Sequence, residues 1–484
     1  MYEHHDLGKQ KRTMSVAEET EITDVTADSV DALLAASLIE HLEPSIDCVS
    51  TSDMEEAASA LSESDRKALA AMESADDFIA RMRAEFPPPQ PAELQLEFDT
   101  TWRAASETKA QKAHSMALQD KELIRLAGKI SEFAGREQVA FERIVYRMKD
   151  QLGEGGQGIV FLLEAEDQFG ARRAMKLFRP SSSDMNAATF LHEMERMGDV
   201  ASRVHRSWHD DLVNVDWFGI HDGVHVMLMQ FIDGFNLQEL LQPKLLEGVR
   251  PYVDDERWNT LNNVVYSNSG SQQLAFRPSI AVYIAERILR GLERLHGESL
   301  VHSDIKPSNV MLDASGSLKI IDIGSAFRKE APPKIPLGTP AYAATELLES
   351  KQCTEQSDLA SVGYVLVEML SGQPIAQGIC GPDATTRTIG KKERDAHLAL
   401  KRDLPDKLGE LIPAKVRDAK LLVELCQRLI APKPGDRFKD ANAVIDVCFK
   451  FNKDLIIGDL AINNYKEIQH LLRNAKKADR RRAS

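Results

Sequence analysis

HSDIKPSN, residues 302–309, is the stretch on which the interpretation of this 484-residue chain rests. Asp304 and Asn309 lie five residues apart in a polar loop. An aspartate can orient a hydroxyl group and accept its proton, and an asparagine amide oxygen can bind a hard cation. Lys306 places a positive charge between the two. An ordinary polar turn would have the same composition, so the neighbouring segments must decide.

Upstream, GEGGQGIV at residues 153–160 is rich in glycine. Glycines allow a backbone to approach phosphate oxygens closely and to direct N–H groups at them. Dinucleotide-binding folds and plain turns use the same spacing. Val160 here continues a strand–turn–strand pattern instead of opening a helix, which disfavours the dinucleotide interpretation.

The next two segments supply a buried charge and its partner. AMKL at residues 174–177 is a short apolar strand that carries Lys176. A lysine that faces inward from such a strand needs a negatively charged partner. The helix-like stretch FLHEMER at residues 190–196 offers Glu193, which we favour, and Glu195 as the alternative.

Downstream, LKIIDIG at residues 318–324 is an apolar strand that ends in Asp322. A carboxylate in this place lies beside the polar loop and can bind Mg²⁺ together with phosphate oxygens. A strand-terminating turn is the plain alternative for this segment taken alone.

All five segments, in this order, resemble the signature set of the eukaryotic-type (Hanks-type) protein kinases, over residues 146–448. The resemblance implies an α+β, bilobal protein-kinase-like fold with a small β-rich lobe containing one key helix and a larger α-helical lobe. It also implies transfer of the γ-phosphoryl group of ATP, with Mg²⁺ or Mn²⁺, to protein substrates. Lys306 followed by Pro307 is similar to the serine/threonine class.

The resemblance also assigns the site residue by residue. The catalytic group is Asp304, Lys306 and Thr339, and the metal ligands are Asn309 and Asp322. The implied ATP-binding residues are Leu152, Gly153, Glu154, Gly155, Gly156, Gln157, Gly158, Val160, Ala174, Lys176, Glu193, Met229 as gatekeeper, Gln230 and Ile232 in the hinge, and Met311. The implied structural supports are His302, Asp358, Glu346 and Arg437.

Four departures from the family pattern are visible. Ser303 replaces the arginine usual before the catalytic aspartate, Ile323 replaces a phenylalanine, Ala360 replaces a tryptophan, and ATE at residues 344–346 replaces APE. Kinases without that arginine generally need no phosphate on the activation loop, because the residue that would pair with it is missing. None of the four removes a group needed for phosphoryl transfer.

The charge is unevenly distributed along the chain. Residues 1–100 carry 23 Asp and Glu against 7 Lys and Arg, whereas the whole chain has a net charge of −15. We therefore predict an acidic arm with a Pro-rich linker at residues 1–91, a helical segment at 92–145, the kinase domain at 146–448, and a helical extension with a basic tail at 449–484. The arm is a candidate surface for interaction partners.

Other expectations follow from what the sequence lacks. A basic footprint typical of nucleic-acid binding is missing, and no apolar run reaches the roughly 18 residues of a membrane span. The five cysteines form no C-x-x-C pair, which fits reduced thiols. We expect a cytoplasmic protein, with secretion without a cleaved signal as the alternative.

Two other functions stay open at this stage. One is a pseudokinase that signals by contact, and the other is a small-molecule kinase of the aminoglycoside or choline type, which generally lacks a segment like Gly338-Thr339-Pro340 and an equivalent of Arg437. We also predict insertions at residues 242–278 and 378–401, and the hypothesis for the basic tail is that Ser484 is an autophosphorylation or pseudosubstrate site. A frayed, solvated tail is the plainer alternative.

Overall fold

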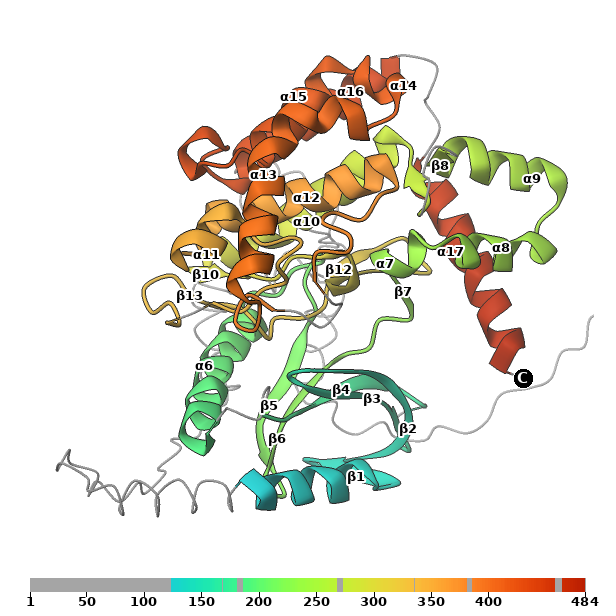
Figure 1. Cartoon of the computed structure of the whole chain (residues 1–484). Helices are drawn as coiled ribbons and strands as arrows, with labels where there is room; N and C mark the ends of the chain where they lie inside the picture. Colours follow the sequence, from blue (N-terminus) through green and yellow to red (C-terminus); the bar gives the residue numbers. More distant parts are fainter. Residues whose placement is uncertain are drawn as a thin grey trace, which may run out of the picture. The chain divides into compact units, whose positions relative to one another are not determined.

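The computed structural model describes residues 123–167, 169–180, 186–267, 273–334, 336–380, 385–457 and 464–483. The predicted acidic arm, the Pro-rich linker and Ser484 lie outside the described residues, so these predictions stay predictions. We call residues 123–230 the small lobe and residues 234–483 the large lobe, since Figure 1 shows a curled sheet in the first and mainly helices in the second.

The small lobe is built on one six-stranded sheet in the order β1-β2-β3-β4-β6-β5, with every neighbouring pair antiparallel. The strands are β1 (Gln138–Phe141), β2 (Ile144–Gly155), β3 (Gly158–Ala165), β4 (Arg172–Phe178), β5 (Val215–His221) and β6 (Val224–Gln230). Four of the five strand pairs are formed by strands that follow each other in the chain, in line with the glycine-punctuated apolar runs of the sequence, whereas α6 (Ala187–Arg206) and β5 lie between β4 and β6 in the chain.

Each face of the sheet buries a different cluster. In β4, Ala174 and Phe178 join the main core with α6 (Ala187–Arg206), while Met175 and Leu177 point to the other face. This alternation is the period of two expected for a strand. A helix at residues 123–134 covers the second face and buries Phe133 there.

Of the helical segment that we predicted for residues 92–145, the structure describes the part from residue 123 onward, and residues 123–134 of it form a helix. It ends before Gly135, and the following residues form strand β1, so the prediction was wrong over Gln138–Phe141. The physical reason is the alternation of Val139 and Phe141 as buried residues with exposed neighbours, which satisfies a sheet edge but not a helix face. Strand β2 begins at Ile144, so the sheet starts before residue 146.

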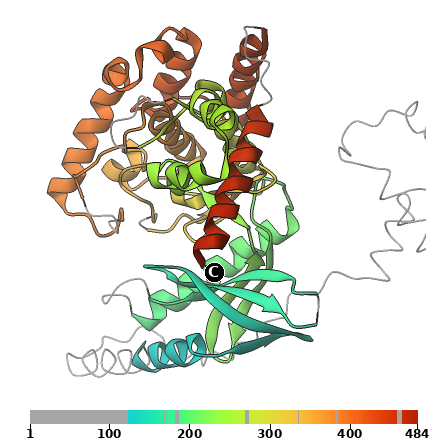
Figure 2. The same cartoon turned by 90° about the vertical axis from the view of Figure 1, so that its right-hand side faces the viewer.

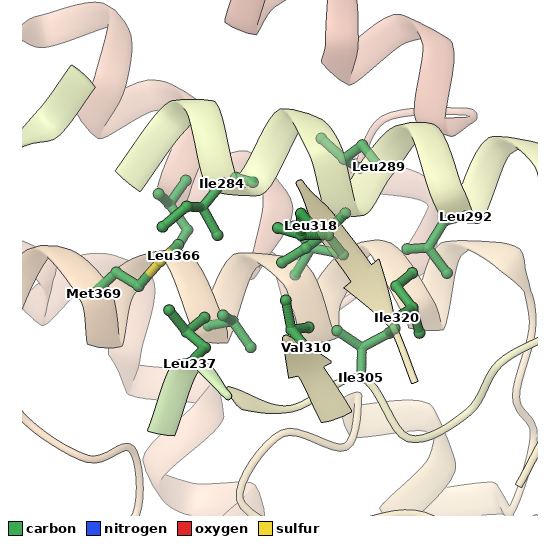
Figure 3. Packing of buried hydrophobic residues seen from close by; sticks show 14 of the residues in the cluster. Leu237, Ile284, Leu289, Leu292, Ile305, Val310, Leu318, Ile320, Leu366 and Met369 are labelled. Atoms are coloured by element: carbon green, nitrogen blue, oxygen red, sulfur yellow. The ribbon is translucent and has the colours of Figure 1, made fainter. Parts of the chain in front are cut away.

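The large lobe packs around two long helices, α10 (Pro278–Gly297) and α12 (Glu355–Ser371). Figure 3 shows side chains of both helices meeting strands β11 (Val310–Asp313) and β12 (Leu318–Ile320), with Ile305 of the polar loop inserted below them. Ile305 is fully buried. The loop is therefore anchored in the core by its own apolar residue.

The remaining helices and strands complete the large lobe. They are β7 (Gly234–Asn236), α7 (Leu237–Leu240), α8 (Pro243–Val249), α9 (Asp255–Thr260), β8 (Tyr266–Ser267), β9 (Ala275–Phe276), β10 (Leu300–Val301), β13 (Phe327–Arg328), α11 (Thr345–Ser350), α13 (Lys391–Leu411), α14 (Ala414–Arg417), α15 (Lys420–Leu429), α16 (Ala441–Ile457) and α17 (Asn464–Ala483). The first predicted insertion, residues 242–278, forms α8, α9 and the β8–β9 pair.

Helix α17 lies against α8, as Figure 2 shows in red beside green. Its buried residues Ile468, Leu471 and Leu472 join the main core. Lys476 forms an ion pair with Asp233 at 2.8 Å, just before β7. The predicted helical extension thus packs on the large lobe and reaches the connection between the lobes. Within the described part of the chain, no helix is both long and apolar enough to cross a membrane.

Candidate active site

The polar loop follows β10 and leads through a 3₁₀ turn at Pro307–Asn309 into β11. The Asp304 carboxylate accepts hydrogen bonds from the Thr339 backbone N–H at 2.8 Å and from its hydroxyl at 2.7 Å. Lys306 Nζ lies 3.0 Å from Asp304 Oδ2 and 3.1 Å from Thr339 Oγ1. The three residues predicted as catalytic are therefore in direct contact.

Asn309 belongs to the same network. Its Nδ2 donates to the Asp304 backbone oxygen at 2.8 Å and lies 3.3 Å from Asp304 Oδ2. With the amide nitrogen used in this way, the amide oxygen stays available as an acceptor or cation ligand.

Asp358, in α12, organises the backbone of the loop from below. This fully buried carboxylate accepts the N–H groups of His302 at 2.9 Å and Ser303 at 2.8 Å, and it lies 2.9 Å from His296 Nε2. Ser303 has a φ of 70°, an uncommon conformation for a residue with a side chain. Asp358 holds this conformation in place, as expected for the aspartate that supports the loop.

The side chain of Ser303 connects the loop to the segment before Thr339. Its hydroxyl donates to the Leu337 carbonyl oxygen at 2.7 Å. Burial lowers the pKa of the neighbouring His302, so this ring is neutral at physiological pH. At the place where the family usually has an arginine, a neutral serine hydroxyl thus links the loop to Leu337.

A second support lies deeper in the large lobe. Arg437 binds Glu346 through two parallel contacts of 2.7 Å, and Ser357 donates to the same carboxylate at 2.6 Å. Burial would raise the pKa of Glu346, but the hydrogen bonds from Arg437 and Ser357 hold it below its usual value. The structure brings the predicted pair of Glu346 and Arg437 together as a bidentate ion pair.

On the small-lobe side, the glycine-rich stretch forms the hairpin between β2 and β3. A side chain at Gly158 would place its Cβ 2.0 Å from the Leu177 carbonyl oxygen, so only glycine fits there. At Gly153 and Gly155 the space is open. Arg179 fastens the hairpin by pairing with Glu154 at 2.6 Å and donating to the Gly155 oxygen at 3.0 Å.

The hinge and the residues predicted around an adenine ring follow the sheet. Ala174 is paired in register with Met229, and Val160 with Lys176. Met229 and Ile232 are buried, and the Gln230 backbone N–H donates to the Asn214 carbonyl oxygen at 2.9 Å. Two further residues were predicted to bind ATP. Met311 is half-buried in β11, and Leu152 is exposed near the end of β2.

Lys176, in β4 of the small lobe, is buried and reaches Asp322 of the large lobe. Its ammonium group lies 3.0 Å from Asp322 Oδ1 and 3.1 Å from Gln157 Oε1. Against the effect of burial, Lys176 and the Gly324 N–H lower the pKa of Asp322 to about 2. Asp322 is therefore an anion across the physiological range.

The expected partner of Lys176 is placed elsewhere. The Glu193 carboxylate is bound by Arg387 at 2.5 Å and lies 3.8 Å from Arg196. The choice of Glu193 over Glu195 agrees with exposure, because the Glu193 side chain is 18% exposed and that of Glu195 is 63% exposed. The ion pair of Lys176 with Glu193, both described residues, is thus a prediction that this structure does not fulfil.

Asn309 and Asp322 were predicted to hold a metal ion, and their chemistry fits one. Both offer oxygen atoms, the donors that Mg²⁺ and Mn²⁺ prefer. Among the described residues, no group of three His, Cys, Asp or Glu gathers for a metal. Two protein oxygens completed by phosphate oxygens would be the usual arrangement for Mg²⁺ at a phosphoryl-transfer site.

Sequence reasoning missed three arginines. Arg179 fastens the glycine-rich hairpin, Arg196 donates to the Gly324 and Ala326 carbonyl oxygens, and Arg387 binds Glu193. Arg387 lies in the second predicted insertion, which was treated as a charged segment of no assigned role. These contacts join residues up to 194 positions apart, and no local pattern could reveal them.

Comparison with known families and proteins agrees with this geometry. The protein kinase domain family matches residues 146–447. The chain is 28% identical over 301 residues to the serine/threonine-protein kinase PknD of Mycobacterium tuberculosis, which covers 61% of this chain and 38% of PknD. It is 28% identical over 306 residues to PknA of Corynebacterium glutamicum, covering 61% of this chain and 54% of PknA.

The chain therefore spans between about a third and a half of the length of these curated relatives. Among solved structures, the kinase domain of Mycobacterium tuberculosis PknI aligns over 65% of this chain and 98% of that domain, with 18% identity and a TM-score of 0.42.

Proposed function

The chain belongs to the protein kinase family, and from this premise we propose that it transfers the γ-phosphoryl group of ATP to serine and threonine hydroxyl groups of proteins. The observation that carries the proposal is the network of Asp304, Lys306, Thr339 and Asn309, which lies in one connected set of hydrogen bonds. These are the groups that such a transfer needs on the side of the hydroxyl.

Asp304 has the central role in the proposed reaction. Its carboxylate would orient the attacking hydroxyl group and accept its proton. Lys306, 3.0 Å away, would offset negative charge that develops at the transferred group. Thr339 holds the carboxylate through two hydrogen bonds, so its orientation is set before a substrate arrives.

The nucleotide would be held from the small lobe. Lys176 would contact phosphate oxygens, the glycine-rich hairpin would cover them, and residues 230–232 would meet the adenine ring. Asn309 and Asp322 would hold Mg²⁺ or Mn²⁺, which when bound neutralises phosphate charge and polarises the bond to be broken. The pKa of Asp322, lowered to about 2, keeps this carboxylate in the ionised form that a metal requires.

The serine/threonine class is supported by Lys306 and by its contact with Thr339 at 3.1 Å. Ser303 supports a further part of the proposal, namely that the substrate loop needs no phosphate to be positioned. Its hydroxyl already binds Leu337, two residues before Thr339. Regulation would then act elsewhere in the chain.

A phosphate-transfer assay tests the proposal. The full chain is incubated with Mg²⁺, ATP labelled at the γ-phosphate and casein, and labelled serine, threonine and tyrosine are separated after hydrolysis. We expect label on serine or threonine and a loss of about 10²- to 10⁴-fold in Asp304→Asn. Asp395→Asn, an exposed aspartate in α13, is the matched control and keeps wild-type activity.

Two results would overturn the proposal. Equal, near-zero transfer by wild type and Asp304→Asn would indicate a pseudokinase, and loss of ATP–Mg²⁺ binding in a thermal shift assay would favour the same conclusion. Transfer to an aminoglycoside or choline but not to protein would indicate a small-molecule kinase.

A further inference from the structure

Glu193 of α6 is held from two sides. Its Oε1 lies 2.5 Å from Arg387, and its Oε2 lies 3.8 Å from Arg196. All three side chains are less than a quarter exposed, so water screens these charges less than at the surface. Glu193 is therefore committed to arginines and not to the lysine that the family resemblance assigns to it.

The turn that carries Arg387 is fixed firmly to the large lobe. Thr386 donates its backbone N–H to the Gly338 oxygen at 2.9 Å and its hydroxyl to the Pro336 oxygen at 2.8 Å. Ile389 is buried with Leu347 and Leu398 in a cluster of the large lobe. Arg387 is thus a rigidly mounted large-lobe residue that reaches across to a small-lobe helix.

Lys176 binds other partners in place of Glu193. Its ammonium group is satisfied by Asp322 at 3.0 Å and Gln157 at 3.1 Å. Arg196, one turn after Glu193, binds carbonyl oxygens of Gly324 and Ala326, which follow Asp322 in the chain. Lys176 and Glu193 are therefore both bound to other residues. Arg196 holds α6 in the orientation that goes with these contacts.

We propose that Arg387 is a positioning residue that competes with Lys176 for Glu193, and so sets the fraction of molecules in which the lysine–glutamate pair is formed. The inference rests on the proposed function, in which Lys176 must be oriented for ATP. Arg387 holds the Glu193 carboxylate at 2.5 Å, away from Lys176, whose ammonium group contacts Asp322 and Gln157. Forming the pair with Lys176 therefore requires the contact with Arg387 to weaken. Loss of Arg387 then shifts the two-state equilibrium toward the pair with Lys176.

The same turn links the proposed substrate side to α6. Thr386 binds the oxygens of residues 336 and 338, and Thr339 binds Asp304. Arg387 therefore stands on a turn that contacts the segment before Thr339 and also binds Glu193 of α6.

Substitutions at Arg387 test the inference in the full chain. Arg387→Gln, which removes the charge, should raise kcat of phosphate transfer about five- to tenfold, the lower end of the usual range of coupling between two states. Arg387→Lys keeps a positive charge and should stay near wild type. Arg387→Met, which preserves the aliphatic stem, should behave as Arg387→Gln and guards against a folding defect in one variant. The matched control is Arg402→Gln, which breaks an exposed pair with Glu349 in the same lobe.

Hydrogen exchange supplies a readout that does not depend on catalysis. Freed from Arg387, α6 should exchange its amides faster between residues 187 and 206, whereas Arg402→Gln should leave them unchanged. Unchanged kcat and unchanged exchange in both Arg387→Gln and Arg387→Met would overturn the inference while leaving the proposed function intact. If no form of the protein transfers phosphate, the proposed function fails, and exchange in α6 alone decides whether Arg387 holds the helix.

Discussion

The two sides of the site differ in how completely they are assembled. On the large-lobe side, Asp304, Lys306, Thr339 and Asn309 form one hydrogen-bonded set that rests on Asp358. On the small-lobe side, Lys176 binds Asp322 and Gln157, while Glu193 binds Arg387. The large-lobe side has the contacts that the family resemblance implies. On the small-lobe side, the implied contact of Lys176 with Glu193 is replaced by contacts with other residues.

The two sides differ because one is formed within a single loop that is anchored in the core, whereas the other depends on contacts between separate elements. The residues of the polar loop are neighbours in sequence and are anchored in the core by Ile305 and Asp358, both fully buried. A close-packed interior resists small displacements, so this side has one arrangement. A pair of Lys176 with Glu193 would join a strand to a helix that also contacts the other lobe. Contacts of this kind can exchange partners when the helix shifts.

Lys176→Met is the substitution with the largest expected effect on this comparison. It removes the ammonium group that would contact phosphate, and we expect kcat/KM to fall by about 10²- to 10³-fold, as for loss of one electrostatic contact in an active site. Steady-state kinetics with varied ATP measures it. Lys149→Met, an exposed lysine on β2 paired with Glu164 at 3.6 Å, is the control. A similar loss in both variants would show that the small-lobe side has no special role.

Arg437→Met tests how firmly the large lobe holds its side. The substitution leaves the buried Glu346 carboxylate without its bidentate partner, and we expect the free energy of unfolding to fall by about 3–5 kcal/mol. Urea unfolding measures it. Arg402→Met breaks an exposed ion pair and should cost less than about 1 kcal/mol. Equal losses in the two variants would contradict the view that burial makes the difference.

His397, in α13, should make the stability of the protein sensitive to acid. Burial, together with the charge of Lys401, lowers the pKa of this fully buried histidine to about 4. The unfolded chain binds the proton first, so the stability that the neutral ring contributes is present above about pH 6.5 and is lost as the pH falls toward 4.

We expect this loss to reach roughly 3 kcal/mol over that interval. Urea unfolding at a series of pH values measures the slope, and His397→Gln should flatten it. His192→Gln, whose imidazole is 84% exposed, is the control. A slope that stays the same in His397→Gln would assign the acid sensitivity to other groups.

Ser303→Ala has the smallest expected effect. It removes one hydrogen bond of 2.7 Å to Leu337, which is worth about 1 kcal/mol. We expect kcat to fall about two- to fivefold, since the loop keeps its support from Asp358. Kinetic comparison with Ser315→Ala, a serine in an exposed turn, checks it. A loss as large as that of Lys176→Met would mean that this hydroxyl alone positions the substrate loop.

Much of the site was predictable because its residues lie in short sequence motifs that follow one another in a fixed order. Asp304 and Asn309 lie in one loop, and the spacing of the segments around Lys176 and Asp322 identified the family. The contacts of Thr339 with Asp304 and of Arg437 with Glu346 also agree with that resemblance. The helical prediction failed over Gln138–Phe141, where a four-residue edge strand carries too short a pattern to distinguish it from a helix.

The sequence by itself determined which chemical groups are present, their order along the chain and the family to which they belong. Only the tertiary structure decided which of those groups are paired. Arg387 and Glu193 are 194 residues apart, and nothing local in either segment indicates that they meet. Ion pairs depend on distances of a few ångströms and on the exclusion of water, and folding alone sets both. The role of the loop at residues 302–309 could be predicted from its sequence. Which partner Lys176 binds, in contrast, depends on how α6 and the Arg387 turn pack together.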